Sequence, residues 1–384
     1  NKRLIHSAVL GLIFEKINGY KDGSFFTPSL VTMYMCRRSL RKAVVQRFNE
    51  VKDWQCETLD DVYENVGAGR AARTEANKIV NSVTICDPSV GSGHFLVSAL
   101  NEMIAIKSEL RILQDLDGKR LKEYDVKIVN DDLVIIDDDG DFFKYRPKGK
   151  ESQRVQTALF HEKQTIIKSC LFGVDINPNS VKICRLRLWI ELLKNAYYSN
   201  DFDLETLPNI DINIKCGNSL VSRFALNTDL SKLLKKSKWT IETYRNTVSA
   251  YRNETNSLVK SQMSDLISTI KESFSTNISR DSKEQKQLRK LGAELYNKFI
   301  GKQIFDENLT EKQQEEREKE QEKLEQKIAE LEASIEATKN SKLYDKAFEW
   351  RFEFPEVLHD DGSFIGFDII SVSYTHLRAH ETCG

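Results

Sequence analysis

The stretch DPSVGSGHFL, residues 87–96, decides the fold. It follows the β-branched run Val83–Cys86 and leads into residues 94–114, whose apolar spacing is helical. This order predicts a strand, a glycine turn and a helix, which is the junction where doubly wound α/β folds bind cofactors. Gly91 and Gly93 have no Cβ, so the backbone there can turn sharply and approach a ligand.

Polar groups at this junction suit a small zwitterion. The free N–H groups at the start of the predicted helix would bind a carboxylate. Asp87, at the end of the strand, is placed to accept from an amino group. A glycine turn without a ligand is the alternative, because a Gly-x-Gly after a strand is a weak signal by itself.

The rest of the first half alternates between strands and helices. Strands are predicted at Leu171–Ile176 and Ile212–Cys216, with a helix over residues 179–195 between them. Residues 126–146 read as a hairpin turned at Asp139-Gly140. The alternation predicts an α/β fold with a parallel sheet. The hairpin is expected to explain why Asp87 and Asp175 are much farther apart than the ~20 residues of a plain dinucleotide fold.

Three more segments place polar groups at strand or helix ends. Asp175, in GVDINP (residues 173–178), could bind both hydroxyls of a ribose. The alternative is a helix cap, although the residues after it, Asn177, Pro178 and Asn179, already provide capping chemistry. Asn218, in CGNSL (residues 216–220), could pair with an adenine edge or simply form a turn. In FFTP (residues 25–28), Thr27 is expected to cap a helix whose first residue is Pro28.

Composition excludes several classes of protein. The net charge is −1 with 30% charged residues, so any surface that binds nucleic acid must be local. The seven cysteines form no Cys-x-x-Cys pair, so we predict no metal site and no disulfide framework, which suits a reducing cytoplasm. No apolar run is long enough to cross a membrane.

Residues 228–343 are polar and helical, with almost no glycine or proline. Basic residues exceed acidic ones in the first part, and this surplus predicts contacts with a DNA backbone through Lys232, Lys235, Lys236 and Lys238. A solvated helix face is the alternative. Farther along, a heptad seam is formed by apolar residues, and it predicts a short coiled-coil hairpin: Leu324, Ile328, Leu331 and Ile335.

Taken together and in this order, the segments resemble the gamma-class adenine-specific DNA methyltransferases, especially the type IIG restriction–modification enzymes and their phage-defence relatives. The resemblance implies a class I S-adenosylmethionine-dependent methyltransferase fold, a Rossmann-like doubly wound sheet, here with a long α-helical insertion. It also implies N6-adenine methylation of double-stranded DNA. The cofactor-binding positions that it implies are Phe26, Thr27, Pro28, Asp87, Pro88, Gly91, Gly93, Asp175, Asn177 and Asn218.

The chain departs from this family after Ile370. The family places an Asn/Asp-Pro-Pro-aromatic tetrapeptide there, which holds the flipped target base. This sequence contains no Pro-Pro and continues as SVSYTHLRAHETCG. Residues 371–374 could be a degenerate version of the motif. We instead expect 371–384 to be a non-native tail derived from a sequencing adaptor, so no catalytic residue is assigned.

These patterns predict five segments. They are a helical lead-in from a longer protein (1–24), a cofactor-binding domain (25–227), the helical insertion (228–343), a return to the sheet (344–370) and the tail (371–384). Two alternatives stay open: a methyltransferase of the same fold that acts on RNA or on a protein glutamine, and a non-enzymatic helical interaction protein. A nicotinamide dehydrogenase is disfavoured because the third glycine of G-x-G-x-x-G is missing. The oligomeric state is left open.

Overall fold

The computed structural model describes most of the chain, in two compact units. The described residues are 9, 11, 13, 28–198, 205, 207–224, 226, 238–280, 283–300, 311–339, 344 and 346–371. The first unit contains residues 1–219, 248–260 and 366–384, and the second contains 220–247 and 261–365.

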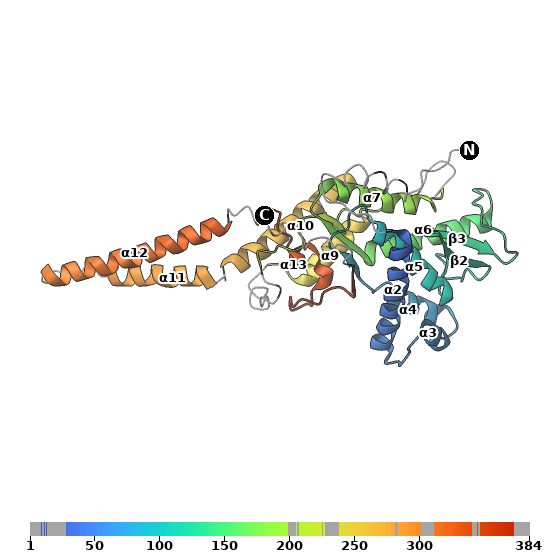
Figure 1. Cartoon of the computed structure of the whole chain (residues 1–384), viewed down its shortest axis with the longest axis horizontal. Helices are drawn as coiled ribbons and strands as arrows, with labels where there is room; N and C mark the ends of the chain where they lie inside the picture. Colours follow the sequence, from blue (N-terminus) through green and yellow to red (C-terminus); the bar gives the residue numbers. More distant parts are fainter. Residues whose placement is uncertain are drawn as a thin grey trace. The chain divides into compact units, whose positions relative to one another are not determined.

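The first unit holds a four-stranded parallel sheet and the helices around it (Figure 1). Its helices are α2 (Ser29–Lys52), α3 (Leu59–Asn65), α4 (Arg70–Val80), α5 (His94–Glu109), α6 (Lys150–Ser169) and α7 (Pro178–Leu193). Its sheet strands are β1 (Ile85–Asp87), β4 (Leu171–Asp175), β5 (Ile214–Cys216) and β6 (Ile369–Ile370).

The strands lie in the order β5-β4-β1-β6, and all neighbours are parallel. All residues of β1 and β4 are buried, as expected for a parallel sheet with both faces covered. The chain therefore moves outward from β1 to β4 and β5, and β6 returns to the other side of β1. Such a reversal of strand order creates a crevice at the carboxyl ends of the strands.

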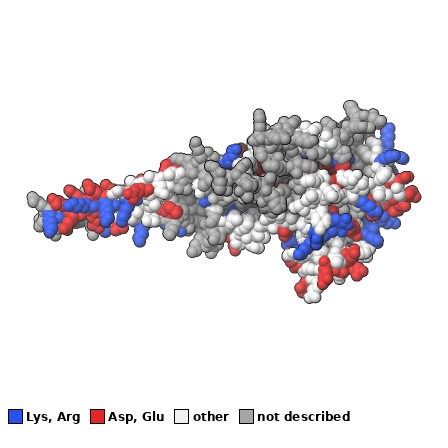
Figure 2. Space-filling view, viewed as in Figure 1, with Lys and Arg blue, Asp and Glu red and all other residues white. Residues whose placement is uncertain are grey.

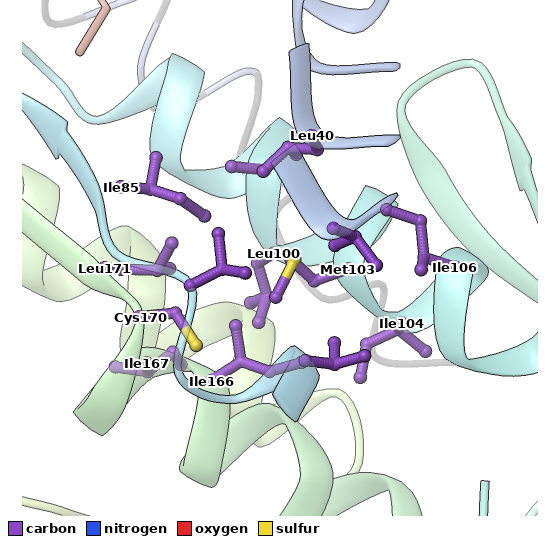
Figure 3. Packing of buried hydrophobic residues seen from close by; sticks show 14 of the residues in the cluster. Leu40, Ile85, Leu100, Met103, Ile104, Ile106, Ile166, Ile167, Cys170 and Leu171 are labelled. Carbon is purple, nitrogen blue, oxygen red and sulfur yellow. The ribbon is translucent and has the colours of Figure 1, made fainter. Parts of the chain in front are cut away.

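A continuous apolar core fixes the sheet beneath α5. Leu100 and Met103 of α5 are fully buried and meet Ile85 of β1, Leu171 of β4 and Leu40 of α2 in one cluster (Figure 3). Helix α5 packs against α2, α6 and α7. Because the core holds β1 and α5 together, it also fixes the turn that joins them.

The predicted turn of the hairpin was wrong. The strands β2 (Tyr124–Val129) and β3 (Asp132–Asp137) pair antiparallel, and the turn between them is Asn130-Asp131. Both turn residues have left-handed backbones, with φ 51° and 66°, which Asn and Asp tolerate better than other non-glycine residues. Asp139-Gly140 forms a second turn, after which Phe142 pairs with Ile136.

The connection from β1 to β4 is longer than the hairpin alone explains. It contains α5, the hairpin and the 20-residue helix α6, which the sequence analysis did not identify. Helices α3 and α4, in the weakly periodic part that follows α2, were not predicted from the sequence either. Helix α3 nevertheless has a capping box, in which Thr58 accepts from the N–H of Asp61 and Asp61 accepts from the N–H of Thr58.

The start of α2 differs from the prediction by one residue. Helix α2 begins at Ser29, and Pro28 occupies the N-cap position, where its carbonyl accepts from the N–H groups of Val31 and Thr32. Phe26 and Thr27 lie outside the described residues.

The second unit has a separate, aromatic core. It includes most of α9 (Ile241–Asn253) and of α10 (Ser257–Arg280), together with α11 (Lys283–Leu295), η1 (Tyr296–Ile300), α12 (Glu311–Lys339), α13 (Trp350–Glu353) and η3 (Pro355–Val357). Tyr244 and Phe352 both pack against Phe274, and the Tyr244 hydroxyl donates to the Phe352 carbonyl. The predicted segment 344–370 is divided, because 344–365 groups with this unit and 366–370 with the first.

Helix α12 packs along α11 (Figure 1). The predicted seam residues are partly buried on α12, whereas most of the other described residues of this helix are exposed: Leu324, Ile328, Leu331 and Ile335. The charged faces of these helices are visible in Figure 2. Within the described parts of the chain, no helix is both long enough and apolar enough to cross a bilayer.

Candidate functional site

Three strands bring their carboxyl ends together at one edge of the sheet. Asp87 ends β1 in register with Gly173 of β4, and Asp175 ends β4 in register with Cys216 of β5. The parallel pairing therefore places both predicted carboxylates at the same edge, although 88 positions separate them in the chain (175 − 87).

Asp175 connects the glycine turn to β4. Its Oδ2 accepts from the Gly91 N–H at 2.8 Å, and its Oδ1 accepts from the Asn177 N–H at 2.8 Å. Burial raises the pKa of this carboxyl, and the two N–H donors oppose the rise. An ionised carboxylate offers about four acceptor positions, so roughly two remain for hydroxyl groups of a ligand.

Asp87 is buried deeper, with 2% of its surface exposed. Burial raises its pKa to about 7, and the nearby charge of Asp175 adds to the rise. The N–H of Ser89, which donates to Asp87 Oδ1 at 3.0 Å, opposes it. Two buried acids at one edge favour a ligand that brings donors or positive charge, because such a ligand stabilises their ionised forms.

The two glycines of the turn have different roles. Both have left-handed backbones, with φ 51° at Gly91 and 82° at Gly93. A Cβ on Gly93 would lie 2.5 Å from Cys184 Sγ, so this glycine is required by packing against α7. A Cβ on Gly91 would meet no atom within 4 Å, so the space beside it is open to a ligand.

A buried arginine, which the sequence analysis missed, supports this turn from below. The guanidinium of Arg187 donates to the Ser92 carbonyl at 3.1 Å and to the Ser92 hydroxyl at 2.9 Å. It also lies 3.2 Å from His94 Nδ1. Burial, and then the charge of Arg187, lower the pKa of His94 to about 4. His94 is therefore neutral near pH 7 and can accept from Arg187.

The remaining predicted residues surround the same edge. Asn177 caps α7, since its Oδ1 accepts from the Asn179 N–H at 2.9 Å. Pro88 is buried within the glycine turn, and Asn218 is partly buried after β5. Ile176 is 50% exposed beside Asp175, which leaves an apolar surface for a planar group.

Strand β6 places its carboxyl end next to Asp87. Ser371 is buried and donates its N–H to the Cys86 carbonyl at 2.9 Å. The residue that follows β6 therefore lies beside the end of β1, next to Asp87 and on the side of β1 away from β4. The rest of the predicted tail, 372–384, lies outside the described residues.

The predicted DNA-contacting lysines are mostly outside the described part. Only Lys238 of this group is described; it is exposed, with Nζ 5.0 Å from the centroid of the Trp239 ring. Three other basic residues of this region make contacts within their own unit: Arg245 with Asp360, Arg252 with Asn213, and Lys260 with Asn209. Lys232, Lys235 and Lys236 are not described.

Across the described residues, no group of three or more His, Cys, Asp or Glu side chains is arranged to hold a metal ion.

Comparison with known proteins gives two matches. The family described as Eco57I restriction-modification methylase matches residues 169–370. A candidate type II restriction enzyme and methyltransferase of Methanocaldococcus jannaschii is 32% identical over an alignment of 240 residues that covers 56% of this chain. The matched part spans 16% of the length of that relative. No solved structure matches.

Proposed function

The chain belongs to the Eco57I restriction-modification methylase family, and we propose that it forms the S-adenosylmethionine-binding part of an N6-adenine DNA methyltransferase. The observation that carries the proposal is the pair of buried carboxylates, Asp87 and Asp175, beside the glycine turn at the carboxyl edge of a parallel sheet. S-adenosylmethionine would supply an activated methyl group, and the chain would bind and orient it.

The residues present fit this cofactor. The free acceptor positions of Asp175 suit the two ribose hydroxyls, and the open space beside Gly91 lets the cofactor approach the backbone. Asp87 suits the amino group of the methionine moiety. Ile176 and Asn218 offer an apolar surface and a polar edge for the adenine.

The strand order also supports the proposed fold. Numbered by appearance within the sheet, β5-β4-β1-β6 becomes 3-2-1-4, which is the central part of a Rossmann-like doubly wound sheet. In the class I methyltransferase fold that we propose, β6 would lead to the motif that holds the target adenine. The carboxyl end of β6 lies next to Asp87, because the Ser371 N–H donates to the Cys86 carbonyl.

The ribose contact predicts a ligand-dependent effect of Asp175→Ala. A hydrogen bond to a charged group contributes ~1.5–3 kcal/mol, so the variant should bind S-adenosylhomocysteine about tenfold to a hundredfold more weakly in calorimetry. Its 2′,3′-dideoxy analogue lacks both hydroxyls, so wild type and variant should bind that analogue nearly equally. If Asp175→Ala weakens both ligands by the same factor, the side chain only holds the glycine turn and the proposed ribose contact is wrong.

Asp87 predicts an unusual dependence of stability on pH. Its folded-state pKa of about 7 is above the ordinary value of ~3.9, so the folded state binds the proton more tightly. Stability from this group is present below pH ~4 and is lost as the pH rises toward 7. Asp87→Asn removes this loss, so its melting temperature should exceed that of wild type increasingly between about pH 4 and pH 7 and then level off, while its affinity for S-adenosylmethionine falls.

Melting curves of both proteins at matched ionic strength check this prediction. Asp175 also has a raised pKa, so some pH dependence should remain in the variant. Parallel pH profiles for wild type and Asp87→Asn would show that Asp87 keeps an ordinary pKa.

Methyl transfer is expected to require more than the cofactor site. The residues after Ile370 provide no Pro-Pro to fix acceptors beside a flipped adenine. Loss of such positioning costs orders of magnitude in rate. We therefore expect the 384-residue chain to transfer no radiolabelled methyl group to duplex DNA while it still binds the cofactor. Clear incorporation would mean that the SVSY segment is a working variant of the motif.

A further inference from the structure

A second cluster of charged side chains lies away from the carboxyl edge, in the first unit. Arg73 of α4, Arg111 after α5 and Arg120 in the following loop line one hollow of about 350 Å³. The glycine-rich loop before α4, residues 67–69, lines the same hollow. All of these residues are described, and none belongs to the proposed cofactor site.

Arg73 and a neighbouring arginine, Arg70, meet at one point of the backbone, Gly118. Arg73 Nη2 donates to the Gly118 carbonyl at 2.9 Å. The side chain of Arg70 crosses the same residue, since a Cβ on Gly118 would lie 2.5 Å from Arg70 Nε. Arg120 follows two residues later. Burial, and then the charges of Arg111 and Arg73, lower its pKa, while the charges of Tyr63 and Glu123 oppose this. The cluster is therefore close enough for mutual repulsion.

Among the described residues, no carboxylate lies within ion-pair distance of this cluster, and the charge of Glu123 acts on Arg120 only from farther away. Other surface arginines of the unit have partners, as Arg154 has in Asp115 and Glu151. None of Arg70, Arg73, Arg111 and Arg120 makes an ion pair within 4.0 Å with a described residue. Glu64 lines the hollow without reaching them.

Two donors in the cluster are held in place without an acceptor. Arg73 Nε is shielded from solvent and makes no hydrogen bond among the described residues. Arg111 is held with its guanidinium 5.0 Å from the centroid of the Tyr63 ring, so stacking fixes its direction while its N–H groups stay free to donate. The first turn of α4 adds free N–H groups, because Gly69 at its N-cap has no side chain to accept from them.

We propose that Arg73, Arg111 and Arg120 bind a phosphate group of the DNA backbone, at a site separate from the cofactor edge. Planar guanidinium groups match phosphate oxygens. Arg111 and Arg120 also line the neighbouring hollow, which is bounded by acidic residues, so this site would contact one phosphate group of a duplex rather than a run of them. The choice of DNA rests on the proposed function. Such a contact would anchor the duplex without reading its sequence.

The test is the salt dependence of DNA binding by the full chain. The probe is a fluorescein-labelled duplex of arbitrary sequence, and the variant is Arg111→Gln with Arg120→Gln. The slope of log K against log salt is negative, and each lost phosphate contact reduces its magnitude by about 0.9. The magnitude of the slope should therefore fall by at least that amount in the variant. Arg111→Lys with Arg120→Lys keeps the charges and should retain most of the slope.

A matched control removes two charges nearby. Lys122 and Lys127 line the neighbouring hollow and are paired with Glu123 at 3.9 Å and with Asp125 at 3.2 Å. Lys122→Gln with Lys127→Gln should therefore leave the slope nearly unchanged. An equal fall in both variants would mean that only net charge matters, and the proposed site would be wrong. An unchanged slope in the arginine variant, or no DNA binding by the unmodified chain, would also contradict the proposal.

Two further measurements separate the alternatives. Affinity for S-adenosylmethionine should be the same in the arginine variant and in wild type. The cofactor site and the phosphate site can therefore be tested independently of each other. Melting with inorganic phosphate against chloride at equal ionic strength tests a free anion. If phosphate stabilises only the wild type while the DNA slope does not change, the site binds free phosphate and the assignment to DNA is wrong.

Discussion

The carboxylate of Asp175 is the interaction on which the candidate site depends. It accepts from Gly91 and from Asn177 at once, and thereby joins the glycine turn after β1 to the start of α7 after β4. Parallel pairing of β1 with β4 makes this possible, because it sets Asp87 opposite Gly173 and leaves Asp175 two residues farther toward the edge. Without that register, Asp175 would not lie beside the turn.

Burying this charge has a cost that the structure offsets locally. Desolvation raises the pKa of both Asp87 and Asp175, and backbone N–H groups lower it again only in part. Next to the turn, Arg187 is nearly inaccessible, and its guanidinium donates to both oxygens of Ser92. The site thus holds two buried carboxyl groups in fixed positions, although burial disfavours their ionised forms. This is the usual condition of a binding site that is preorganised for a ligand.

The strand ends could be predicted from the sequence because glycine, Asp-Pro and Asn-Pro are strong local signals. Prediction failed where two local signals competed, as between Asn130-Asp131 and Asp139-Gly140, both of which are turns. It also could not separate buried Arg187 from Arg185, since only tertiary packing tells which of two arginines in one helix faces the core. The arginine cluster joins α4 to segments some 40 residues away, a convergence that no local pattern encodes.

Hydrogen exchange of the full chain with and without S-adenosylmethionine would show whether the cofactor lies on the glycine turn. Amide exchange should slow in peptides that cover residues 87–93 and 173–177, where the ligand would lie on the turn that Asp175 holds. Peptides that cover residues 67–73 and 111–120, at the arginine cluster, should not change. No protection at the glycine turn at saturating cofactor, or protection confined to other segments, would contradict the assignment of the cofactor site.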